Sequence, residues 1–426
     1  MTEPPRADGR SWEAFSTTAG IAPYARDFVV VSGVDAGSYL QGQLSADVLA
    51  LGDGESVLSF VLAPDGKADA LLRVTAQEGG FLLDCDGGFG TSIVTRLERF
   101  KLRVKVDIEQ VPRECWAVRG PRSAGCRERF EAEAIPGALV LECLWPGVVG
   151  FDLVGAVGVA AAERESDRGT MAGDPRFEPL DIAGLERCDP ATLEALRIAA
   201  GMPKMGAEIV EGVIPAETGI VEEAVSFTKG CYTGQELTER IASRGGNTPR
   251  KLRHLVVDPA GSAPHAPVTP YPGTTLHKDG KQVGTVTSVA VLPPTAEVIR
   301  RFGAGAGAGE RAGEGEGASE GAGAGECEGE GEGAEAGEGE GEGAGAGEGE
   351  GAEASAGAEA GEGGGEGAGA GHRDDYSGPV WVCLAYLARS VNPGERVAIG
   401  EAGEGPGEEG GGGAIAKVIA ITVPPS

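Results

Sequence analysis

The stretch Lys229-Gly230-Cys231-Tyr232-Thr233-Gly234-Gln235-Glu236 holds a thiol, an amine, an aromatic ring, two glycines and a carboxylate within eight residues. Leu237 and Ile241 follow it four residues apart, a spacing that places both on one face of a helix. We therefore expect a helix to begin at Thr233 or Gly234. Its first turn would hold a glutamine and a glutamate, and the helix dipole favours a carboxylate there. The octet thus predicts a turn that runs directly into an amphipathic helix.

Cys231 stands just before this expected helix start and two residues after Lys229. A helix N-terminus and a nearby cation both lower the pKa of a thiol and raise its thiolate fraction. The glycines permit backbone angles and close approaches that a side chain would block. The alternative is a small buried cysteine in a turn, since free cysteine often packs as a small apolar side chain. The residues themselves leave both interpretations open.

The octet closely resembles Lys-Gly-Cys-Tyr-x-Gly-Gln-Glu, the signature of the YgfZ family of folate-binding proteins that support iron–sulfur enzymes. A second block, Leu40-Gln41-Gly42-Gln43-Leu44-Ser45-Ala46-Asp47, resembles the Leu-Gln-Gly-Gln segment of that family and of its relatives, the glycine-cleavage T-proteins. Asp47 stands at the family's acidic position, whereas Ser45-Ala46 replaces the more usual Thr-Asn pair. The end of a helix is an equally good explanation of Ser45 and Asp47.

This resemblance implies a tetrahydrofolate-binding protein with the T-protein fold, in which an α+β core precedes a small C-terminal β-barrel. The residue pattern also favours α+β, because helices and strands alternate while several strands are linked as hairpins. The resemblance covers about residues 28–257 and the strands on both sides of a Gly/Ala/Glu-rich segment. We expect four parts: a flexible tail at 1–20, a folate-binding core of two interleaved subdomains at 21–248, a β-barrel at 249–302 and 372–426, and a disordered insert at 303–371.

Two further blocks indicate residues that would contact the folate. Arg197-Ile198-Ala199-Ala200-Gly201-Met202-Pro203 resembles the family's Arg-x-x-x-Gly-x-Pro block, and Ile214-Pro215-Ala216-Glu217 resembles its Pro-x-Glu element. A carboxylate suits the pterin because it can accept two parallel hydrogen bonds from the 2-amino and ring N–H groups. Glu217 is the candidate for that contact, and a solvated loop glutamate is the alternative. The resemblance implies a site with Cys231 and Lys229 as catalytic residues and with Asp47, Arg197, Glu217, Tyr232, Gln235, Glu236 and Arg240 as folate-binding residues.

Two basic features have more than one interpretation. Arg240 stands four residues after Glu236, in the acid-then-base order that favours an ion pair on a helix. Contact with the polyglutamate tail of a folate is the other interpretation. The run Lys101-Leu102-Arg103-Val104-Lys105-Val106 alternates basic and apolar residues and resembles a family stretch. It predicts a strand with a solvated basic face, with an anion contact as the alternative.

Several functions remain open at this point. The first is a tetrahydrofolate-binding accessory protein that supports assembly or repair of iron–sulfur enzymes through Cys231, with folate and iron–sulfur client or assembly proteins as partners. The second is a folate-dependent aminomethyl or one-carbon transferase, and the third is a folate-binding module alone. T-protein-like enzymes lack the cysteine and use an aspartate in an asparagine-rich context, whereas this chain has Leu83-Asp84-Cys85-Asp86. Whether the protein is an enzyme therefore stays undecided.

Most of the negative charge lies in one segment. Residues 303–371 contain 18 Glu and one Arg and contribute −17 of the formal net charge of −30, so the remaining residues carry −13. A Gly/Ala/Glu repeat buries too little apolar area to offset the entropy cost of ordering, which predicts disorder. The mildly acidic remainder lacks the basic footprint that nonspecific nucleic-acid binding needs.

Other sequence features exclude several kinds of site. The eight cysteines include no Cys-x-x-Cys pair and the four histidines are not at ligand spacing, so no metal site is expected. No Gly-x-Gly-x-x-Gly opens a helix, and no Walker-type loop is present. The N-terminus lacks an apolar signal core, and no apolar run reaches membrane-spanning length. We therefore expect a cytoplasmic protein without nucleic-acid or membrane partners.

Overall fold

The computed structural model describes residues 3–132, 138–156, 185–258, 269–295, 298, 380–400 and 414–419. The insert expected at 303–371 lies outside these residues. All of the described residues belong to one compact unit. Helices and strands mix along the chain, so the predicted α+β class is confirmed.

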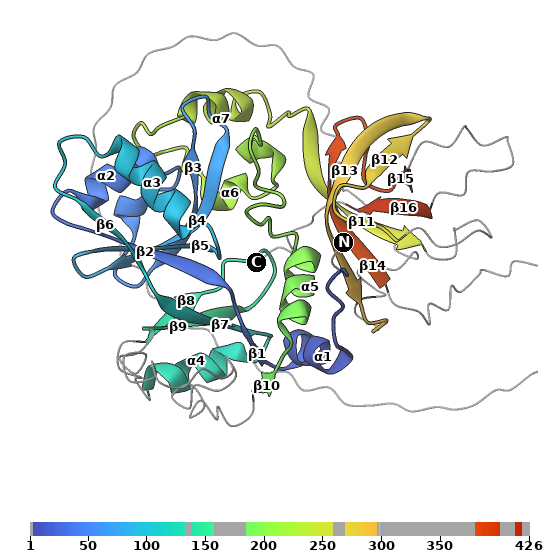
Figure 1. Cartoon of the computed structure of the whole chain (residues 1–426), viewed down its shortest axis with the longest axis horizontal. Helices are drawn as coiled ribbons and strands as arrows, with labels where there is room; N and C mark the ends of the chain where they lie inside the picture. The colour runs from blue at the N-terminus through green and yellow to red at the C-terminus, as the bar shows by residue number, and fades with distance from the viewer. Residues whose placement is uncertain are drawn as a thin grey trace, which may run out of the picture. The chain divides into compact units, whose positions relative to one another are not determined.

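The first sheet has five antiparallel strands in the order β3-β4-β5-β2-β6, which are β2 (Arg26–Ser32), β3 (Ser56–Leu62), β4 (Ala68–Gln77), β5 (Gly80–Asp86) and β6 (Asp107–Val111). Helices α2 (Ala36–Gln43) and α3 (Gly90–Phe100) share its apolar core (Figure 1). The Tyr39 hydroxyl of α2 donates to the Leu97 carbonyl of α3 at 2.5 Å, which ties the two helices together.

The strand predicted at residues 101–106 is wrong, because these residues form a loop and β6 begins only at Asp107. Arg103 has a φ of 57°, which is incompatible with an extended strand. The Lys105 backbone is already engaged, since its N–H donates to the Asp35 carboxylate at 2.7 Å and its carbonyl accepts from the Asp35 N–H at 3.4 Å. The contact with Asp35 is tertiary, so the alternating pattern could not indicate it.

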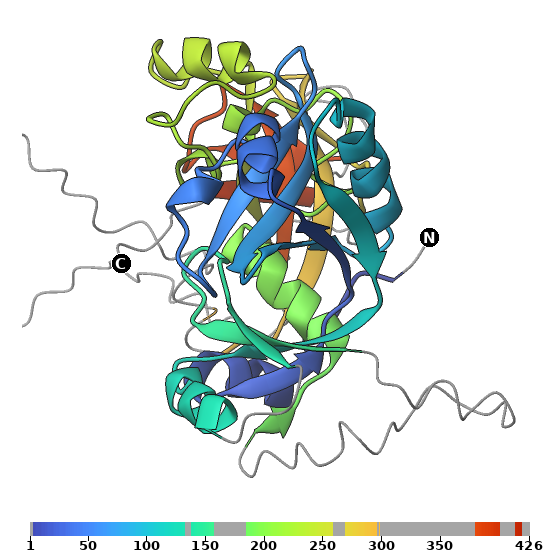
Figure 2. The same ribbon diagram turned by 90° about the vertical axis from the view of Figure 1, so that its left-hand side faces the viewer.

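The second sheet has the order β10-β1-β7-β9-β8, made of β1 (Gly20–Pro23), β7 (Arg113–Arg119), β8 (Leu139–Glu142), β9 (Gly150–Ala156) and β10 (Glu186–Arg187). Helix α4 (Ser123–Ala132) packs against β8 and β9. Figure 2 shows this sheet and α4 at one end of the core, with the first sheet and its helices at the other.

The loose tail predicted at residues 1–20 is wrong for its second half, which forms α1 (Gly9–Thr17) and the start of β1. The Asp8 carboxylate caps α1 by accepting from the Ser11 N–H at 2.9 Å. Trp12 and Phe15 of α1 are buried in two different apolar clusters. The polar composition of this segment hid these two anchoring aromatic residues.

Helix α5 (Pro190–Ala200) ends at Gly201, which lies in the left-handed region at a φ of 74°. The chain then continues through short elements, which are η3 (Pro215–Glu217), α6 (Val221–Ala224) and α7 (Gln235–Ala242). Helix α7 is the amphipathic helix that the octet predicts, and its N-cap is Gly234.

The predicted C-terminal barrel is present. It closes in the order β11-β14-β13-β12-β15-β16, made of β11 (Arg250–Asp258), β12 (Thr275–Lys278), β13 (Lys281–Leu292), β14 (Val380–Ala388), β15 (Arg396–Ile399) and β16 (Ala414–Ile419). Asp279 and Gly280 both have positive φ, the geometry typical of a two-residue hairpin turn, and they join β12 to β13. Strands β13 and β14 pair along most of their length. The segment between them in sequence therefore joins two neighbouring strands.

Candidate functional site

Lys229 joins the octet to the last turn of α2 and to the chain that follows it. Its ammonium donates to three backbone carbonyls at 2.7, 2.8 and 2.7 Å, those of Gln41, Leu44 and Ala46. An ammonium has three N–H donors, so this set uses all of them. Burial lowers the pKa of Lys229 to about 8, and the nearby Asp47 carboxylate opposes that shift. Lys229 thus connects the two sequence blocks that carry the family resemblance and positions the loop.

Two glycines bring the start of α7 against the turn between β3 and β4. A Cβ atom on Gly234 would lie 2.4 Å from the carbonyl oxygen of Ala63, and one on Gly66 would lie 2.5 Å from the Leu237 Cβ. Both glycines also have positive φ, 82° and 84°. The octet is therefore fixed at its first residue, Lys229, by the three hydrogen bonds of the ammonium. It is fixed near its end by the close approach of Gly234 to the β3–β4 turn.

Cys231 lies between these two fixed points with its side chain exposed. Of the other free cysteines that the structure describes, Cys126 is half-buried and the rest are buried. Burial raises the pKa of the thiols of Cys85 and Cys383 to about 12 and that of Cys188 to about 11. Buried thiols with raised pKa values are poor nucleophiles. The alternative of a buried packing cysteine at position 231 is wrong.

Tyr232 points into the core beside the exposed thiol. It is 7 % exposed, and the Lys229 ammonium lies 5.1 Å from its ring centroid. Its N–H donates to the Gln235 side-chain oxygen at 2.7 Å, which closes the turn before α7. Burial raises the pKa of its hydroxyl to about 12, and that hydroxyl has no partner in the described residues. Tyr232 and Gln235 therefore stabilise the loop from inside.

The remaining side chains of this region differ in how firmly they are held. Glu236 and Arg240 are exposed, and within the described chain no ion pair joins them, so the predicted helical pair is not formed. Asp47 is half-buried and accepts from the Gln41 side-chain amide at 2.8 Å. Gln41 also accepts from the Val48 N–H at 3.0 Å, which orients Asp47.

Glu217 is not a solvated loop glutamate. It lies in η3, which packs against α7 and β11, and its side chain is 4 % exposed. Its Oε2 atom accepts from the Arg250 Nε at 3.0 Å and from the Ile214 N–H at 3.3 Å. The Arg250 guanidinium also lies 4.5 Å from the ring centroid of Tyr386. The second carboxylate oxygen, Oε1, accepts no hydrogen bond from the described residues.

Arg197 lies in a separate polar cluster that involves no residue of the octet. Its guanidinium is 3 % exposed and contacts the side chains of Glu194, Glu208 and Ser288 at 2.9, 3.1 and 3.0 Å. Glu208 is fully buried and accepts from the Ser288 hydroxyl at 2.6 Å. Arg197 thus connects α5 to the following loop and to barrel strand β13. The neighbouring carboxylates raise its pKa despite burial.

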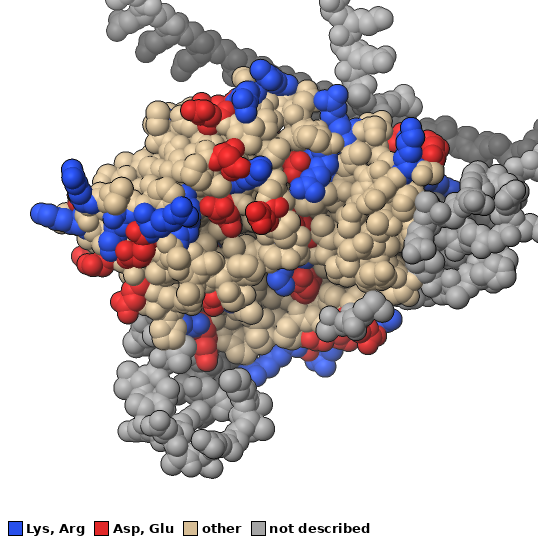
Figure 3. All heavy atoms as spheres, turned by 45° about the horizontal axis from the view of Figure 1, so that its top comes forward, with Lys and Arg blue, Asp and Glu red and all other residues tan. Residues whose placement is uncertain are grey.

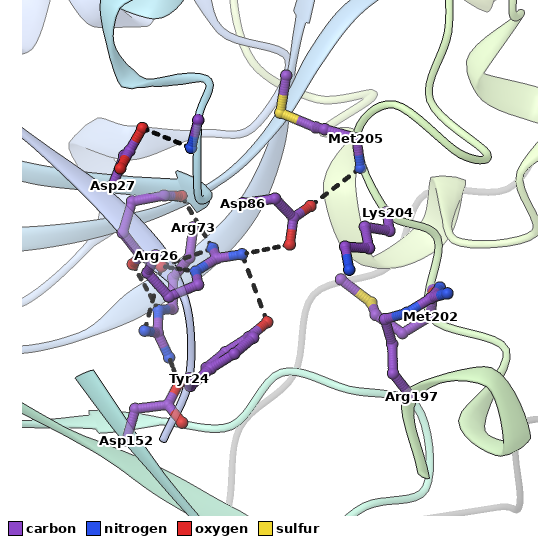
Figure 4. A network of polar contacts seen from close by, with 12 residues as sticks. Tyr24, Arg26, Asp27, Arg73, Asp86, Asp152, Arg197, Met202, Lys204 and Met205 are labelled. Carbon is purple, nitrogen blue, oxygen red and sulfur yellow. Dashed lines mark hydrogen bonds and ion pairs between the residues drawn. The ribbon is translucent and has the colours of Figure 1, made fainter. Parts of the chain in front are cut away.

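Asp84 and Asp86, the two aspartates of β5 in the segment Leu83-Asp84-Cys85-Asp86, are both paired. Figure 4 shows Asp86 with its partner Arg26. Asp84 is fully buried and forms ion pairs with Arg26 and Arg73 at 2.5 and 2.8 Å. These cations hold the pKa of Asp84 below its ordinary value, although burial acts in the opposite direction. Asp86 pairs with Arg26 at 3.1 Å and accepts from the Met205 N–H at 3.0 Å. Neither carboxylate is left without a protein partner.

Arg73 extends this network to the second sheet. It contacts Asp152 of β9 at 2.6 Å, and Asp152 lies 2.8 Å from Arg119 of β7. Three arginines and three aspartates are therefore balanced within the buried network. Its carboxylates come from both sheets, so the network joins the two halves of the core.

No family model matches the chain. The tRNA-modifying protein YgfZ of Enterobacter sp. is 29% identical over 249 residues, which cover 56% of this chain and 70% of that protein. The mitochondrial iron–sulfur cluster assembly factor IBA57 homolog of Phaeosphaeria nodorum is 26% identical over 312 residues, covering 68% and 70%. The glycine cleavage system aminomethyltransferase T of Bartonella henselae superposes with a TM-score of 0.61 at 15% identity, covering 96% and 88%.

The chain is similar in sequence to the YgfZ and IBA57 proteins, at 26–29% identity. The superposition on aminomethyltransferase T shows the predicted T-protein fold. Two residues that hold the candidate side chains were not singled out by the sequence analysis. Gln41, which orients Asp47, lies inside a quoted family block and could have been found there. Arg250, the partner of Glu217, follows no local motif.

The part of the chain that the structure describes has neither a metal-ligand cluster nor a membrane-spanning helix. No group of three or more His, Cys, Asp or Glu residues there could hold a metal ion. None of the described helices is both long enough and apolar enough to cross a membrane.

Proposed function

We propose that this protein binds a tetrahydrofolate and supports the assembly or repair of iron–sulfur enzymes through the Cys231 thiol. Relatives named for iron–sulfur cluster assembly support the second half of the proposal. The observation that carries it is an exposed thiol on a loop fixed at both ends. A reactive group held in one geometry loses less entropy when it meets its target.

Glu217 supports the folate half of the proposal. The Arg250 guanidinium holds its Oε2 atom, so the carboxylate is fixed while Oε1 keeps its capacity to accept hydrogen bonds. A fixed carboxylate of this kind suits the adjacent N–H donors of a pterin. In this proposal the loop that carries Cys231 is shaped by Lys229, Tyr232, Gln235 and Asp47. The side chains of Glu236 and Arg240 are exposed and do not hold this loop.

A Cys231→Ser variant tests the thiol. Serine keeps the size and polarity of the side chain but lacks thiolate chemistry. In a strain deleted for this protein, wild type should restore the activity of an iron–sulfur enzyme and Cys231→Ser should not, while purified Cys231→Ser keeps its affinity for tetrahydrofolate. Cys126→Ser, which replaces a half-buried thiol on α4, is the matched control and should behave as wild type. Full rescue by Cys231→Ser would refute the thiol role.

A Glu217→Gln variant tests the folate contact separately. The amide keeps the shape but offers one acceptor and removes the charge, so the affinity for tetrahydrofolate should fall about tenfold, measured by calorimetry. Glu236→Gln, on an exposed side chain of the same region, serves as the comparison and should change the affinity less. Unchanged affinity in Glu217→Gln would remove that residue from the site.

A folate-dependent aminomethyl or one-carbon transferase is the second candidate, favoured by the superposition on aminomethyltransferase T. The ion pairs of Asp84 and Asp86 argue against a free general base at those positions. Purified protein supplied with tetrahydrofolate and an aminomethyl donor decides the question. Turnover that survives Cys231→Ser would favour the transferase over the accessory protein.

A further inference from the structure

Two loops at one end of the first sheet expose side chains that the proposed function does not use. Residues 33–35 join β2 to α2, and residues 101–106 join α3 to β6. Their exposed side chains, with that of Arg99 in the last turn of α3, form what we call the basic–apolar patch. It consists of Val34, Arg99, Leu102, Arg103 and Lys105.

The two loops are held against each other. The Asp35 carboxylate accepts from the Lys105 N–H at 2.7 Å, and the Asp35 N–H donates to the Lys105 carbonyl at 3.4 Å. A Cβ atom on Gly33 would lie 2.3 Å from that carbonyl oxygen, so only glycine allows this approach. The patch therefore has a defined shape before any partner arrives.

Its apolar members are unusually exposed. Val34 and Leu102 are 84% and 77% exposed, the two highest values among the large apolar side chains of the described residues. Arg103, next to Leu102, has a φ of 57°, a conformation disfavoured for a residue with a Cβ atom. Exposed apolar groups beside a strained backbone are typical of a surface that contacts something else.

The cations of the patch lack acidic partners. Residues 96–105 contain five basic residues and one glutamate. Arg96 pairs with Asp69 and Lys101 with Glu98, whereas Arg99, Arg103 and Lys105 form no ion pair within the described residues. Figure 3 shows Lys and Arg side chains gathered at the left-hand edge, the side on which Figure 1 draws α3 and β6.

Protection of a sheet edge is the simplest alternative. Strand β6 is at the edge of the first sheet, and cations near an edge discourage pairing with another chain. That role accounts for the charges. It does not account for Val34 and Leu102, because exposed apolar side chains would promote the pairing with another chain that the charges oppose.

We propose that the basic–apolar patch is a docking surface for an acidic protein segment that presents carboxylates around an apolar side chain. Val34 and Leu102 would contact the apolar side chain of the segment. Arg99, Arg103 and Lys105 would form ion pairs with its carboxylates. Such charge pairs at an interface favour the correct partner and speed association.

The charge distribution favours a protein over a nucleic acid or a membrane. The whole chain carries a formal charge of −30, which disfavours the binding of an extended polyanion. Screening limits the attraction of the patch to about 10 Å at ordinary salt. A local acidic segment fits within that range, whereas nucleic acid and lipid surfaces require a wider basic footprint.

Binding of a fluorescein-labelled peptide of alternating Glu and Leu residues to the full chain tests the proposal. Wild type should bind it in a salt-dependent way, and Arg103→Glu with Lys105→Glu should weaken binding about tenfold. Leu102→Ser should also weaken it. The matched control is Arg187→Glu with Lys281→Glu, which reverses two exposed cations elsewhere and should leave affinity unchanged.

Polyuridine and vesicles of phosphatidylglycerol are assayed in parallel. The proposal is overturned if wild type does not bind the peptide, or if the control pair loses as much peptide affinity as Arg103→Glu with Lys105→Glu. It is also overturned if either polyanion binds more tightly than the peptide and that binding is abolished by Arg103→Glu with Lys105→Glu. All of the replaced side chains are exposed, so thermal unfolding should stay at the wild-type temperature. Tetrahydrofolate affinity should also be unchanged, which separates this result from the fate of the proposed function.

Discussion

Gly66 and Gly234 meet without room for a side chain on either. A Cβ atom on Gly66 would lie 2.9 Å from the Gly234 carbonyl oxygen, and one on Gly234 would lie 3.2 Å from the Gly66 Cα. This contact sets where α7 begins relative to the β3–β4 turn, and hence where the Cys231 loop lies.

We therefore expect Gly234→Ala to lower the free energy of unfolding by about 2 kcal/mol or more, because it combines a positive φ with a backbone clash. Gly54→Ala is the matched control. Gly54 has a similar φ of 79°, but a Cβ atom there would meet nothing within 4 Å, so only the backbone penalty of about 1 kcal/mol applies. Urea unfolding measures both. Equal losses would mean that the close approach contributes nothing.

Lys229→Met should lower the free energy of unfolding by about 3 kcal/mol, because it leaves three carbonyls without their charged donor. It should also reduce iron–sulfur enzyme rescue, since the loop that carries Cys231 is no longer held. Lys67→Met makes the same change at a lysine that is 46% exposed and that pairs with Asp65, so its effect should stay near zero. A Lys229→Met protein as stable as wild type would contradict the positioning role.

The same lysine predicts a pH dependence. Burial lowers its pKa from 10.5 to about 8 in the folded protein. Between these values the unfolded chain binds more protons, so this group makes the free energy of unfolding rise as the pH rises from about 8 to about 10. Below about pH 8 both states are protonated and the slope from Lys229 vanishes. The difference between wild type and Lys229→Met should therefore grow with pH in that window, and a constant difference would show that the pKa is not lowered.

Elements whose cause is local can be predicted from local chemistry. Gly201 ends α5 because a left-handed C-cap requires glycine, and Asp279-Gly280 turns the β12–β13 hairpin for the same backbone reason. The loop at 101–106 was misassigned because its conformation depends on Asp35, 70 residues away. The contacts of Arg197 could not be predicted from local sequence either, since its partner Ser288 lies 91 residues away in the barrel.

The buried ion network offers a separate test of how the two sheets are joined. Asp152→Asn removes the carboxylate that faces both Arg73 and Arg119, leaving two buried cations underpaired. We expect a loss of about 3–5 kcal/mol in the free energy of unfolding. Asp69→Asn, at a carboxylate that is 40% exposed and faces Arg96, should cost about 1 kcal/mol or less. Similar losses in the two variants would contradict a structural role for the network.

Cys231 should be the fast-reacting thiol of the native protein. Its side chain is exposed, whereas burial raises the pKa values of the five buried thiols, those of Cys85, Cys115, Cys143, Cys188 and Cys383. In a Cys126→Ser, Cys327→Ser background, iodoacetamide at neutral pH should label one site quickly, and mass spectrometry should place it at Cys231. The remaining thiols should react only when urea unfolds the chain, because local opening of a packed core is rare. Adding Cys231→Ser should abolish the fast phase without changing the slow one. Rapid native labelling of any buried cysteine would show that the core opens more readily than its packing indicates.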